Sequence, residues 1–210
     1  MSTYYPIFLN VQGRKCVVVG GGEVAERKAR ALAEQGASVT VISARVSNGL
    51  AQLAEQGAIQ ISVRDYQSGD LENALIAIAA TDDPKVNIDV AREGRERGVL
   101  TNVVDDPEHS DFIVPSLLRR GDISIAISTS GKSPALARRI RTELEQSFAP
   151  EYASLALLLW EVRQELKRDG IHVEGNAWQK SLDLEPLLDM LKKGELEQAK
   201  EKLLSDLLGK

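Results

Sequence analysis

The sequence of 210 residues predicts an α/β fold, in which a parallel sheet is covered by helices and followed by a helical region. Two observations carry this prediction. Short apolar runs alternate with helix-forming stretches up to about residue 104, which is the order of a parallel sheet. A polar helix end, a glycine and an apolar run also recur at 33–37, 54–58 and 95–99. Glycine readily ends a helix in the left-handed conformation, so these segments predict helix-to-strand junctions and not a repeat protein.

The expected strands of this sheet are 15–20, 38–42, 58–63, 75–80 and 99–103. Two further strands are expected at 112–116 and 121–129, the second with isoleucine at every other position. A period of two predicts one buried face. Ser133 and Pro134 then open a helix, as N-cap and first residue. Because two short strands and one helix cannot close a core, this segment is expected to pair with a second copy in a homodimer.

The chain from 151 to 210 is expected to be helical throughout. Its leucines recur at helical spacing, which predicts one long amphipathic helix and two shorter ones after a loop at 170–175. Trp160 and Trp178 are expected to be packing residues. This region carries no recognisable chemistry, and we expect it to form a wall over the site.

Composition narrows the class of protein. A net charge of −5 and a pI near 5.2 argue against general nucleic-acid binding, and no apolar run approaches the ~20 residues that span a bilayer. The amino end shows no signal peptide. A single cysteine, Cys16, excludes an intrachain disulfide and agrees with a cytoplasmic protein; we expect it to be buried.

A glycine turn after the first strand is the strongest functional motif. The apolar run 17–19 leads into Gly20, Gly21 and Gly22, and a helix-forming stretch follows. A dinucleotide pyrophosphate needs this order: Gly20 allows the tight turn, Gly22 lets backbone approach the phosphates, and Ala25 allows close helix–strand packing. The helix N-terminus then faces the phosphates.

The second strand end leaves the cofactor open. NAD sites usually carry an acidic residue here for the ribose 2′-hydroxyl, but this chain has Ser43, Ala44 and Arg45. Ser43 with Arg45 would suit a 2′-phosphate, and Arg45 as a solvated loop residue is the alternative. These residues therefore do not decide between NAD and NADP.

The fourth and fifth strand ends supply the candidate chemistry. Thr81 or Asp82 would line the cofactor and cap the helix that begins near Pro84. Asp105 follows the fifth strand beside the expected nicotinamide, where a carboxylate can act as general acid or base; a solvated turn is the alternative reading. Asp106 precedes a proline and reads as a turn residue.

Other catalytic classes find little support. The two histidines, His109 and His172, are far apart in the sequence, and no nucleophile elbow is present. One cysteine and two distant histidines also argue against a zinc site, so no metal site is expected.

A basic segment lies in an otherwise acidic chain. Between residues 114 and 141, Asp122 is accompanied by six basic side chains: Arg119, Arg120, Lys132, Arg138, Arg139 and Arg141. Such a patch focuses an electric field on an anionic ligand. A solvated helix face with salt bridges across the dimer is the alternative.

Five motifs in order resemble the sirohaem-synthase dehydrogenase family. They lie at 19–28, 79–82, 102–105, 112–116 and 130–134, and the resemblance covers roughly residues 5–148. It implies an NAD-binding Rossmann domain at 1–113, a dimerisation region at 114–149 and a helical domain at 150–210. Members of this family oxidise precorrin-2, an anionic tetrapyrrole, to sirohydrochlorin with NAD⁺ on the route to sirohaem. Some members are also sirohydrochlorin ferrochelatases.

The resemblance implies NAD as the cofactor and Asp105 as the acid/base. The expected cofactor contacts are Gly20, Gly21, Gly22, Glu23, Val24, Ser43, Ala44, Arg45, Thr81, Asn102 and Val103. The expected substrate contacts are Ser130, Lys132, Ser133 and Arg138.

Three alternatives remain open at this stage. The first alternative is a bifunctional dehydrogenase and ferrochelatase, and the second is a ferrochelatase with a vestigial dinucleotide site. The third is a non-catalytic NAD sensor like the regulatory domains of potassium transport systems. Such sensors normally keep the acidic residue that is missing at Ser43, and they do not account for the motifs at 102–105 and 130–134.

Overall fold

The computed structural model describes residues 4–209. The chain divides after Val114 into two compact units, each described by itself below.

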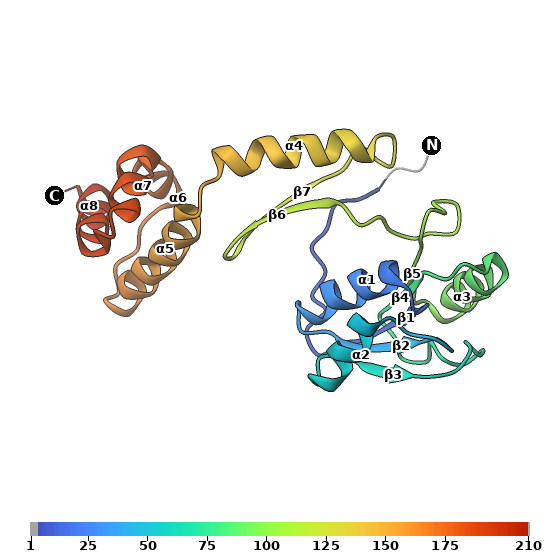
Figure 1. Cartoon of the computed structure of the whole chain (residues 1–210). Coiled ribbons are helices and arrows are strands. Elements are labelled where there is room, and N and C mark those ends of the chain that lie inside the picture. Colours follow the sequence, from blue (N-terminus) through green and yellow to red (C-terminus); the bar gives the residue numbers. More distant parts are fainter. Residues whose placement is uncertain (1–3, 210) are drawn as a thin grey trace. The chain divides into compact units, whose positions relative to one another are not determined.

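The first unit is the predicted parallel sheet with helices on both faces (Figure 1). All five strands are parallel and lie in the order β3-β2-β1-β4-β5. The strands are β1 (Lys15–Val19), β2 (Ser38–Ile42), β3 (Gln60–Ser62), β4 (Ile76–Ala79) and β5 (Leu100–Val103). The helices are α1 (Glu23–Ala33), α2 (Asn48–Glu55) and α3 (Pro84–Arg97).

Alternation along β1 builds two cores. Cys16 and Val18 belong to a buried cluster with residues of α1 and α2, whereas Val17 and Val19 belong to a cluster with residues of α3. Successive strand residues point to opposite faces of a sheet, so α1 and α2 cover one face and α3 the other. Cys16 is fully buried as expected, and this burial raises the pKa of its thiol.

The junctions follow the glycine pattern. Gly98, directly after α3, is left-handed at φ 69°, and Gly36 and Gly57 also have positive φ. Each lies just beyond a helix end. The alternation of strands and helices expected from the sequence is confirmed, although β3 is shorter than the expected 58–63.

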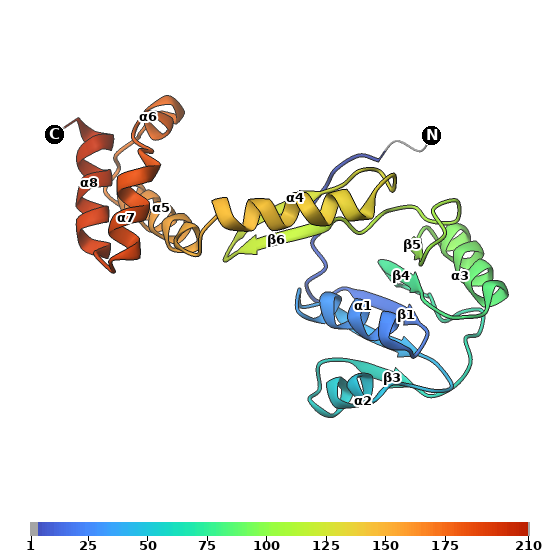
Figure 2. The same ribbon diagram turned by 45° about the horizontal axis from the view of Figure 1, so that its top comes forward.

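The second unit begins with an antiparallel hairpin and a helix that runs along it (Figure 2). The strands are β6 (Ser116–Arg120) and β7 (Ile123–Ile127), and the helix is α4 (Pro134–Ser147). The expected strand at 112–116 is wrong. Asp111 and Phe112 instead bond to β5, and Pro115 has no N–H to donate to a ladder, so pairing starts only at Ser116.

The hairpin and α4 form little core of their own. Leu118 and Ala137 are their buried apolar residues. Leu117 lies on the opposite face of the hairpin from Leu118 because side chains alternate along a strand, and it is 44% exposed. The face that carries Leu117 therefore also holds Arg119, Ser124 and Ala126, and Leu117 is its one large apolar side chain, partly exposed in this unit.

The carboxyl part is helical, as expected. It contains α5 (Glu151–Arg168), α6 (Gly175–Lys180), α7 (Leu184–Lys192) and α8 (Leu196–Leu208). A third core joins α5, α7 and α8. In the part of the chain that the structure describes, three helices and not two follow α5, because the short α6 begins at Gly175, where the expected loop ends. Trp178 packs against this core as expected, but Trp160 is 59% exposed, so the prediction for Trp160 is wrong.

No helix within residues 4–209 is both long enough and apolar enough to cross a membrane.

Candidate functional site

The carboxyl ends of four neighbouring strands form one continuous edge. The Gly20 N–H donates to Ile42 O at 2.9 Å, and the Ala80 N–H donates to Val19 O at 2.8 Å. The Val104 N–H donates to Ala79 O at 3.0 Å. The segments that the sequence analysis selected after β1, β2, β4 and β5 are therefore adjacent, at the edge where parallel α/β sheets bind ligands.

Two of the three glycines are required by the protein itself. A Cβ on Gly20, whose φ is 128°, would lie 2.2 Å from Ala80 O. A Cβ on Gly21 would lie 1.7 Å from Arg45 O. No residue with a side chain fits at either position, because both neighbouring atoms are backbone.

Gly22 is different, since a Cβ there would meet nothing within 4 Å. It stands before α1 as an N-cap without a side-chain hydrogen bond. Within residues 4–209, no acceptor is recorded for the N–H groups of Glu23, Val24 and Ala25. An uncapped helix N-terminus with open space in front of it is a ready site for an anion. These residues fit the pyrophosphate of a dinucleotide.

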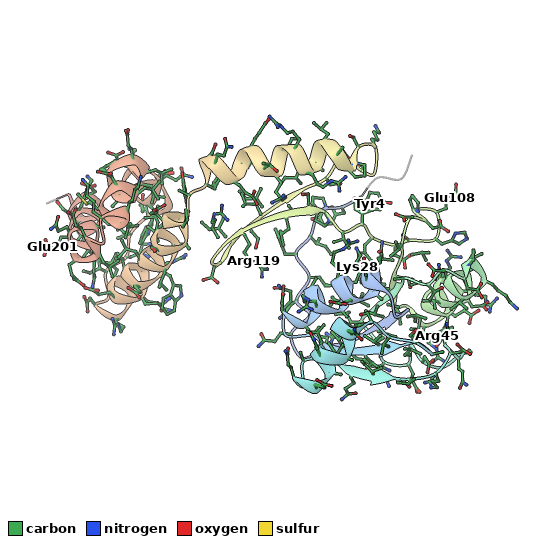
Figure 3. All side chains as sticks on the ribbon, viewed as in Figure 1. Tyr4, Lys28, Arg45, Glu108, Arg119 and Glu201 are labelled. Carbon is green, nitrogen blue, oxygen red and sulfur yellow. The ribbon has the colours of Figure 1, made fainter. Side chains whose placement is uncertain are left out.

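The loop after β2 closes against this turn. The Ser43 hydroxyl donates to Arg45 O at 2.6 Å, and the Ser47 N–H donates to Gly21 O at 2.8 Å. The side chains of Ala44 and Arg45 are exposed, and Arg45 has no ion-pair partner in the described part of the chain (Figure 3). The Ser43 hydroxyl is thus engaged within the loop, while Arg45 remains available.

Thr81 is held in place by a residue that the sequence analysis missed. Its hydroxyl donates to Asn87 Oδ1 at 2.8 Å, and Asn87 Nδ2 donates back to Thr81 O at 3.0 Å. The expected capping role of Thr81 or Asp82 is wrong. Asp83 caps α3, because its Oδ1 accepts the Lys85 N–H at 2.9 Å. The one sequence signal for Asn87 was an amide side chain about one turn beyond the cap, and that pattern is too common to identify a site.

The side chains of β5 hold the following loop. Asn102 Nδ2 donates to Phe112 O at 3.0 Å, and the Val103 N–H donates to Ser110 Oγ at 2.9 Å. Asn102 and Val103 are both buried. Their side chains support the loop and the core, so a contact with the cofactor would have to involve their backbone.

Asp105 is exposed at the start of this loop. Its φ is 60°, the left-handed region, which non-glycine residues rarely occupy and which Asp and Asn tolerate best. Within residues 4–209 its carboxylate forms no hydrogen bond or ion pair. A held backbone with a free carboxylate matches what a proton-transfer group needs.

Asp106 and His109 form a pair in the same loop. His109 Nδ1 lies 2.7 Å from Asp106 Oδ2, and the N–H groups of Glu108 and His109 donate to Asp106 Oδ1. Burial opposes ionisation of Asp106, but the hydrogen bonds from His109 outweigh it and keep its pKa below the usual value. Asp106 is the turn residue that the sequence predicts.

Lys28, labelled in Figure 3, is a half-buried residue of α1, and the charge of Asp105 acts on it. Burial lowers the pKa of Lys28, Arg27 lowers it further, and the charge of Asp105 opposes both. The two groups are too far apart to form an ion pair. A cation and a carboxylate therefore face the same end of the sheet without neutralising each other by contact.

The predicted substrate residues belong to the second unit. Ser133 caps α4 by accepting the Leu136 N–H at 3.2 Å, which confirms its N-cap role. Ser130 and Gly131 have φ of 53° and 80° in the loop before it. Lys132 and Arg138 are exposed.

The basic patch is partly neutralised. Arg139 pairs with Glu143 at 2.8 Å, Arg141 pairs with Glu145, and Arg120 donates to backbone carbonyls at the end of α4. Among the patch residues, those whose side chain has no recorded partner in the described chain are Arg119, Lys132 and Arg138. These three cations could meet an anion, and the ion pairs of the patch lie within one chain, so anion binding and salt bridges across a dimer both stay predictions.

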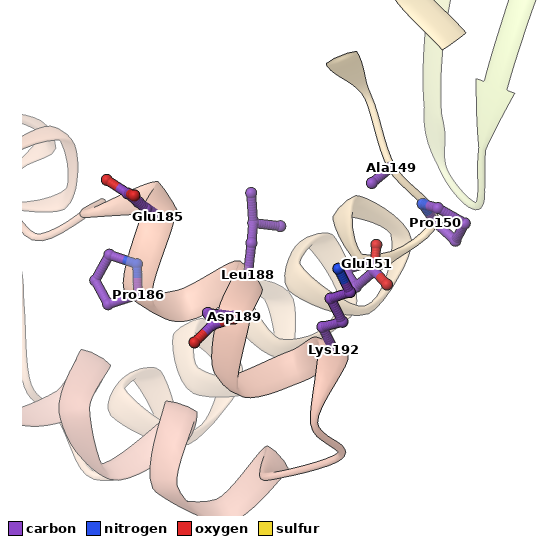
Figure 4. A pocket seen from close by; sticks show the side chains of 8 residues that line it. All are labelled: Ala149, Pro150, Glu151, Glu185, Pro186, Leu188, Asp189 and Lys192. Atoms are coloured by element: carbon purple, nitrogen blue, oxygen red, sulfur yellow. The ribbon is translucent and has the colours of Figure 1, made fainter. Parts of the chain in front are cut away.

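A separate hollow lies between the start of α5 and α7 (Figure 4). Its charged lining residues are Glu151, Glu185, Asp189 and Lys192. It contains none of the predicted site residues, and three carboxylates against one ammonium disfavour a polycarboxylate ligand. Chemistry therefore locates the candidate site at the sheet edge and not in this hollow.

Metal ligands are sparse. No group of three or more His, Cys, Asp or Glu side chains in residues 4–209 is arranged to hold a metal ion.

Comparison with known proteins identifies two regions. Residues 7–116 match a family described as putative NAD(P)-binding, and residues 120–147 match the family described as sirohaem biosynthesis protein central. The first match begins before β1 and ends at the start of β6, so it contains the whole sheet edge described above.

Similar proteins include siroheme synthases. That of Methylococcus capsulatus (strain Bath) is 37% identical over 203 residues, which is 96% of this chain and 43% of the relative. That of Azotobacter vinelandii is 41% identical over 165 residues, 79% of this chain and 36% of the relative. The chain thus spans less than half the length of these relatives. The solved structure of SirC, a precorrin-2 dehydrogenase, matches at a TM-score of 0.77 and 27% identity, covering 95% of this chain and 100% of that one.

Proposed function

Because the chain belongs to the sirohaem synthase dehydrogenase family, we propose that it oxidises precorrin-2 to sirohydrochlorin with NAD⁺ in sirohaem biosynthesis. One observation carries the proposal: the open glycine turn and uncapped start of α1 share a sheet edge with the free carboxylate of Asp105. A dinucleotide site alone would not require that carboxylate. The likeness to SirC, a precorrin-2 dehydrogenase whose chain is covered over its full length, supports a dehydrogenase reaction.

Different residues of this chain bind the cofactor and transfer the proton. When bound, NAD⁺ accepts the hydride that leaves the tetrapyrrole, and one proton must leave with it. Gly20, Gly21 and Gly22 shape the turn for the pyrophosphate, and α1 directs N–H groups at it. Asp105 takes the proton, because its carboxylate is exposed and unbonded.

The proposed remaining cofactor contacts are Glu23, Val24, Ser43, Ala44, Arg45, Thr81, Asn102 and Val103, the last two through backbone. For the substrate we propose Ser130, Lys132, Ser133 and Arg138. The unpaired cations Lys132 and Arg138 support this assignment, since precorrin-2 is a polycarboxylate.

The test is anaerobic NADH formation from precorrin-2 generated in situ. Asp105→Asn is the informative variant, because Asn tolerates the left-handed backbone at φ 60°. We expect a loss of about 10²–10³-fold in rate with NAD⁺ affinity retained. Asp65→Asn, an exposed carboxylate elsewhere in the unit, is the matched control and should leave the rate unchanged.

A wild-type protein that binds NAD⁺ but forms no NADH would favour the sensor alternative. Equal rates of NADH formation for wild type and Asp105→Asn would show that Asp105 does not transfer the proton. The proposed dehydrogenase activity would still stand.

The proposal includes a homodimer formed through 114–149, with 1–113 binding NAD and 150–210 forming a helical wall. The exposed hairpin face that carries Leu117 supports the dimer. Leu117→Glu should shift the mass measured by light scattering from dimer to monomer, while Glu55→Gln on α2 should not. A buried single cysteine fits the proposed cytoplasmic location.

One observation favours a second activity, insertion of Fe²⁺ into the product. Asp106 holds Nδ1 of His109, which leaves Nε2 available to a metal in the loop that carries Asp105. His109→Ala should slow metal insertion without slowing NADH formation. If His109→Ala changes neither the rate of metal insertion nor the rate of NADH formation, the His109 imidazole takes no part in a second activity.

A further inference from the structure

An acidic side chain reaches the loop after β2 from another element. The end of β2 lacks the carboxylate that usually meets the ribose, but Glu26 extends to this loop from α1. Its Oε2 accepts a hydrogen bond from Ser47 Oγ at 2.7 Å. Ser47 is also bonded through its N–H to Gly21 O at 2.8 Å, so a single residue joins Glu26 to the glycine turn.

The Glu26 carboxylate lies against the first turn of α2. A Cβ on Gly49 would lie 2.0–2.2 Å from its carboxylate atoms, so the space beside the Gly49 backbone is filled by this group. Ser47 is the N-cap of α2 and accepts the Leu50 N–H at 3.2 Å. A negative charge therefore already occupies the positive end of the α2 dipole.

This carboxylate is fixed and ionised. Arg30, one turn further along α1, donates to Glu26 Oε1 at 3.1 Å. The hydrogen bond from Ser47 and then that from Arg30 hold the pKa of Glu26 below its usual value. With both oxygens engaged, the group has little freedom to turn away from an approaching ligand.

The same loop carries the opposite charge. Arg45 is exposed and lacks an ion-pair partner within residues 4–209, and its carbonyl is the atom that crowds Gly21. A dinucleotide 2′-phosphate, where one is present, lies at this strand end and is commonly held by an arginine. The loop thus has one cation that attracts a 2′-phosphate, and the Glu26 carboxylate of α1, whose charge Arg30 offsets in part, lies against the loop and repels such a phosphate.

We propose that Glu26, bonded to Ser47 and seated on Gly49, makes this site select NAD over NADP by repelling a 2′-phosphate. This inference rests on the proposed function, since it assumes that the sheet edge binds a dinucleotide. It assigns to a residue of α1 the discrimination that other dinucleotide folds place at the end of β2.

The experiment is calorimetric titration of the full chain with NAD⁺ and with NADP⁺. Glu26→Gln keeps the size of the side chain and an oxygen for Ser47 but removes the charge. We expect NADP⁺ affinity to rise about tenfold and NAD⁺ affinity to stay within about twofold. Glu34→Gln, which makes the same charge change at the far end of α1, should alter neither.

Arg45 provides the second arm. In the Glu26→Gln background, Arg45→Gln should abolish the gain in NADP⁺ affinity, because the cation that holds the phosphate is then missing. If Glu26→Gln does not fold, the single variant Arg45→Gln is decisive: it lacks the attracting cation, so its preference for NAD⁺ must shrink as salt screens the repulsion.

The outcomes separate the two hypotheses. An unchanged NADP⁺ affinity in folded Glu26→Gln, an equal change for both dinucleotides, or a preference of Arg45→Gln that is insensitive to salt would overturn the inference. A wild-type protein that binds NAD⁺ selectively without turning over precorrin-2 would overturn the proposed function and leave the inference standing. A wild-type protein that binds neither dinucleotide would overturn both.

Discussion

The edge of the parallel sheet and the hairpin with α4 are built in opposite ways. At the edge, backbone bonds link four strand ends, and two cores lie behind them. The hairpin and α4 bury only Leu118 and Ala137 among their apolar residues. The sheet edge is fixed by the protein itself, whereas the hairpin and α4 have little buried apolar surface of their own. This difference agrees with the proposal that the edge positions the cofactor and that cations of the second unit bind the anionic substrate.

Ion pairs occur in both regions, so charge pairing does not separate them. In the first unit Arg64 pairs with Asp70 at 2.6 Å, and in the second Arg139 pairs with Glu143 at 2.8 Å. Each region also has exposed cations without an ion-pair partner in the described chain, Arg45 in the first and Lys132 and Arg138 in the second, and such cations remain free for a ligand.

The largest expected effect is that of Gly21→Ala. Its Cβ would overlap Arg45 O at 1.7 Å, so the two loops must separate, at a cost of about 3 kcal/mol in unfolding free energy. Gly22→Ala meets no atom within 4 Å and should leave stability within about 0.5 kcal/mol while weakening NAD⁺ binding. Urea denaturation and NAD⁺ titration measure both. If Gly21→Ala and Gly22→Ala lower the free energy of unfolding equally, the close contact between Gly21 and the Arg45 carbonyl does not stabilise the sheet edge.

Glu93→Gln should have the next largest effect. The buried Glu93 carboxylate accepts hydrogen bonds from Tyr66, Gly69 and Leu71 and pairs with Arg97. Removing its charge should cost about 2–3 kcal/mol in urea denaturation. Glu96→Gln, exposed on the same helix, should cost little.

The stability difference between wild type and Glu93→Gln should also depend on pH. Burial raises the pKa of Glu93, but its four partners outweigh burial and hold it below the usual value. A lowered pKa gives stability that is present above the unfolded value of about 4.3 and is lost as pH falls through the folded value. The difference between wild type and Glu93→Gln should therefore narrow in acid. A constant difference would mean that charge is not the cause.

The smallest effect is expected in the second unit. Ser133→Ala removes the N-cap of α4 and should cost about 1 kcal/mol, measured by thermal unfolding. Ser124→Ala on β7, for which no side-chain hydrogen bond is recorded in the described chain, is the control. A loss as large as that for Glu93→Gln would show that this region is as tightly built as the sheet edge.

Local patterns predicted the elements that local physics controls. The glycine turn, the five parallel strands and the Ser133 cap all depend on residues within a few positions of one another. The sequence could place Asp105 after the fifth strand for the same reason, because the end of a parallel strand identifies the ligand edge. Its left-handed φ does not follow from the strand pattern, because it depends on how the loop closes back on β5 through Ser110.

Contacts between distant segments decided the rest. By itself, the sequence determined the order of strands, helices and glycine turn, and hence the edge at which a dinucleotide binds. Only the tertiary structure showed that Glu26 meets Ser47 across 21 positions, that the Phe112 carbonyl is bonded to Asn102 of β5 instead of starting a new strand, and that Trp160 remains exposed. Periodicity shows which residues can share a face, but the packing of whole elements decides which face is covered and which side chains meet.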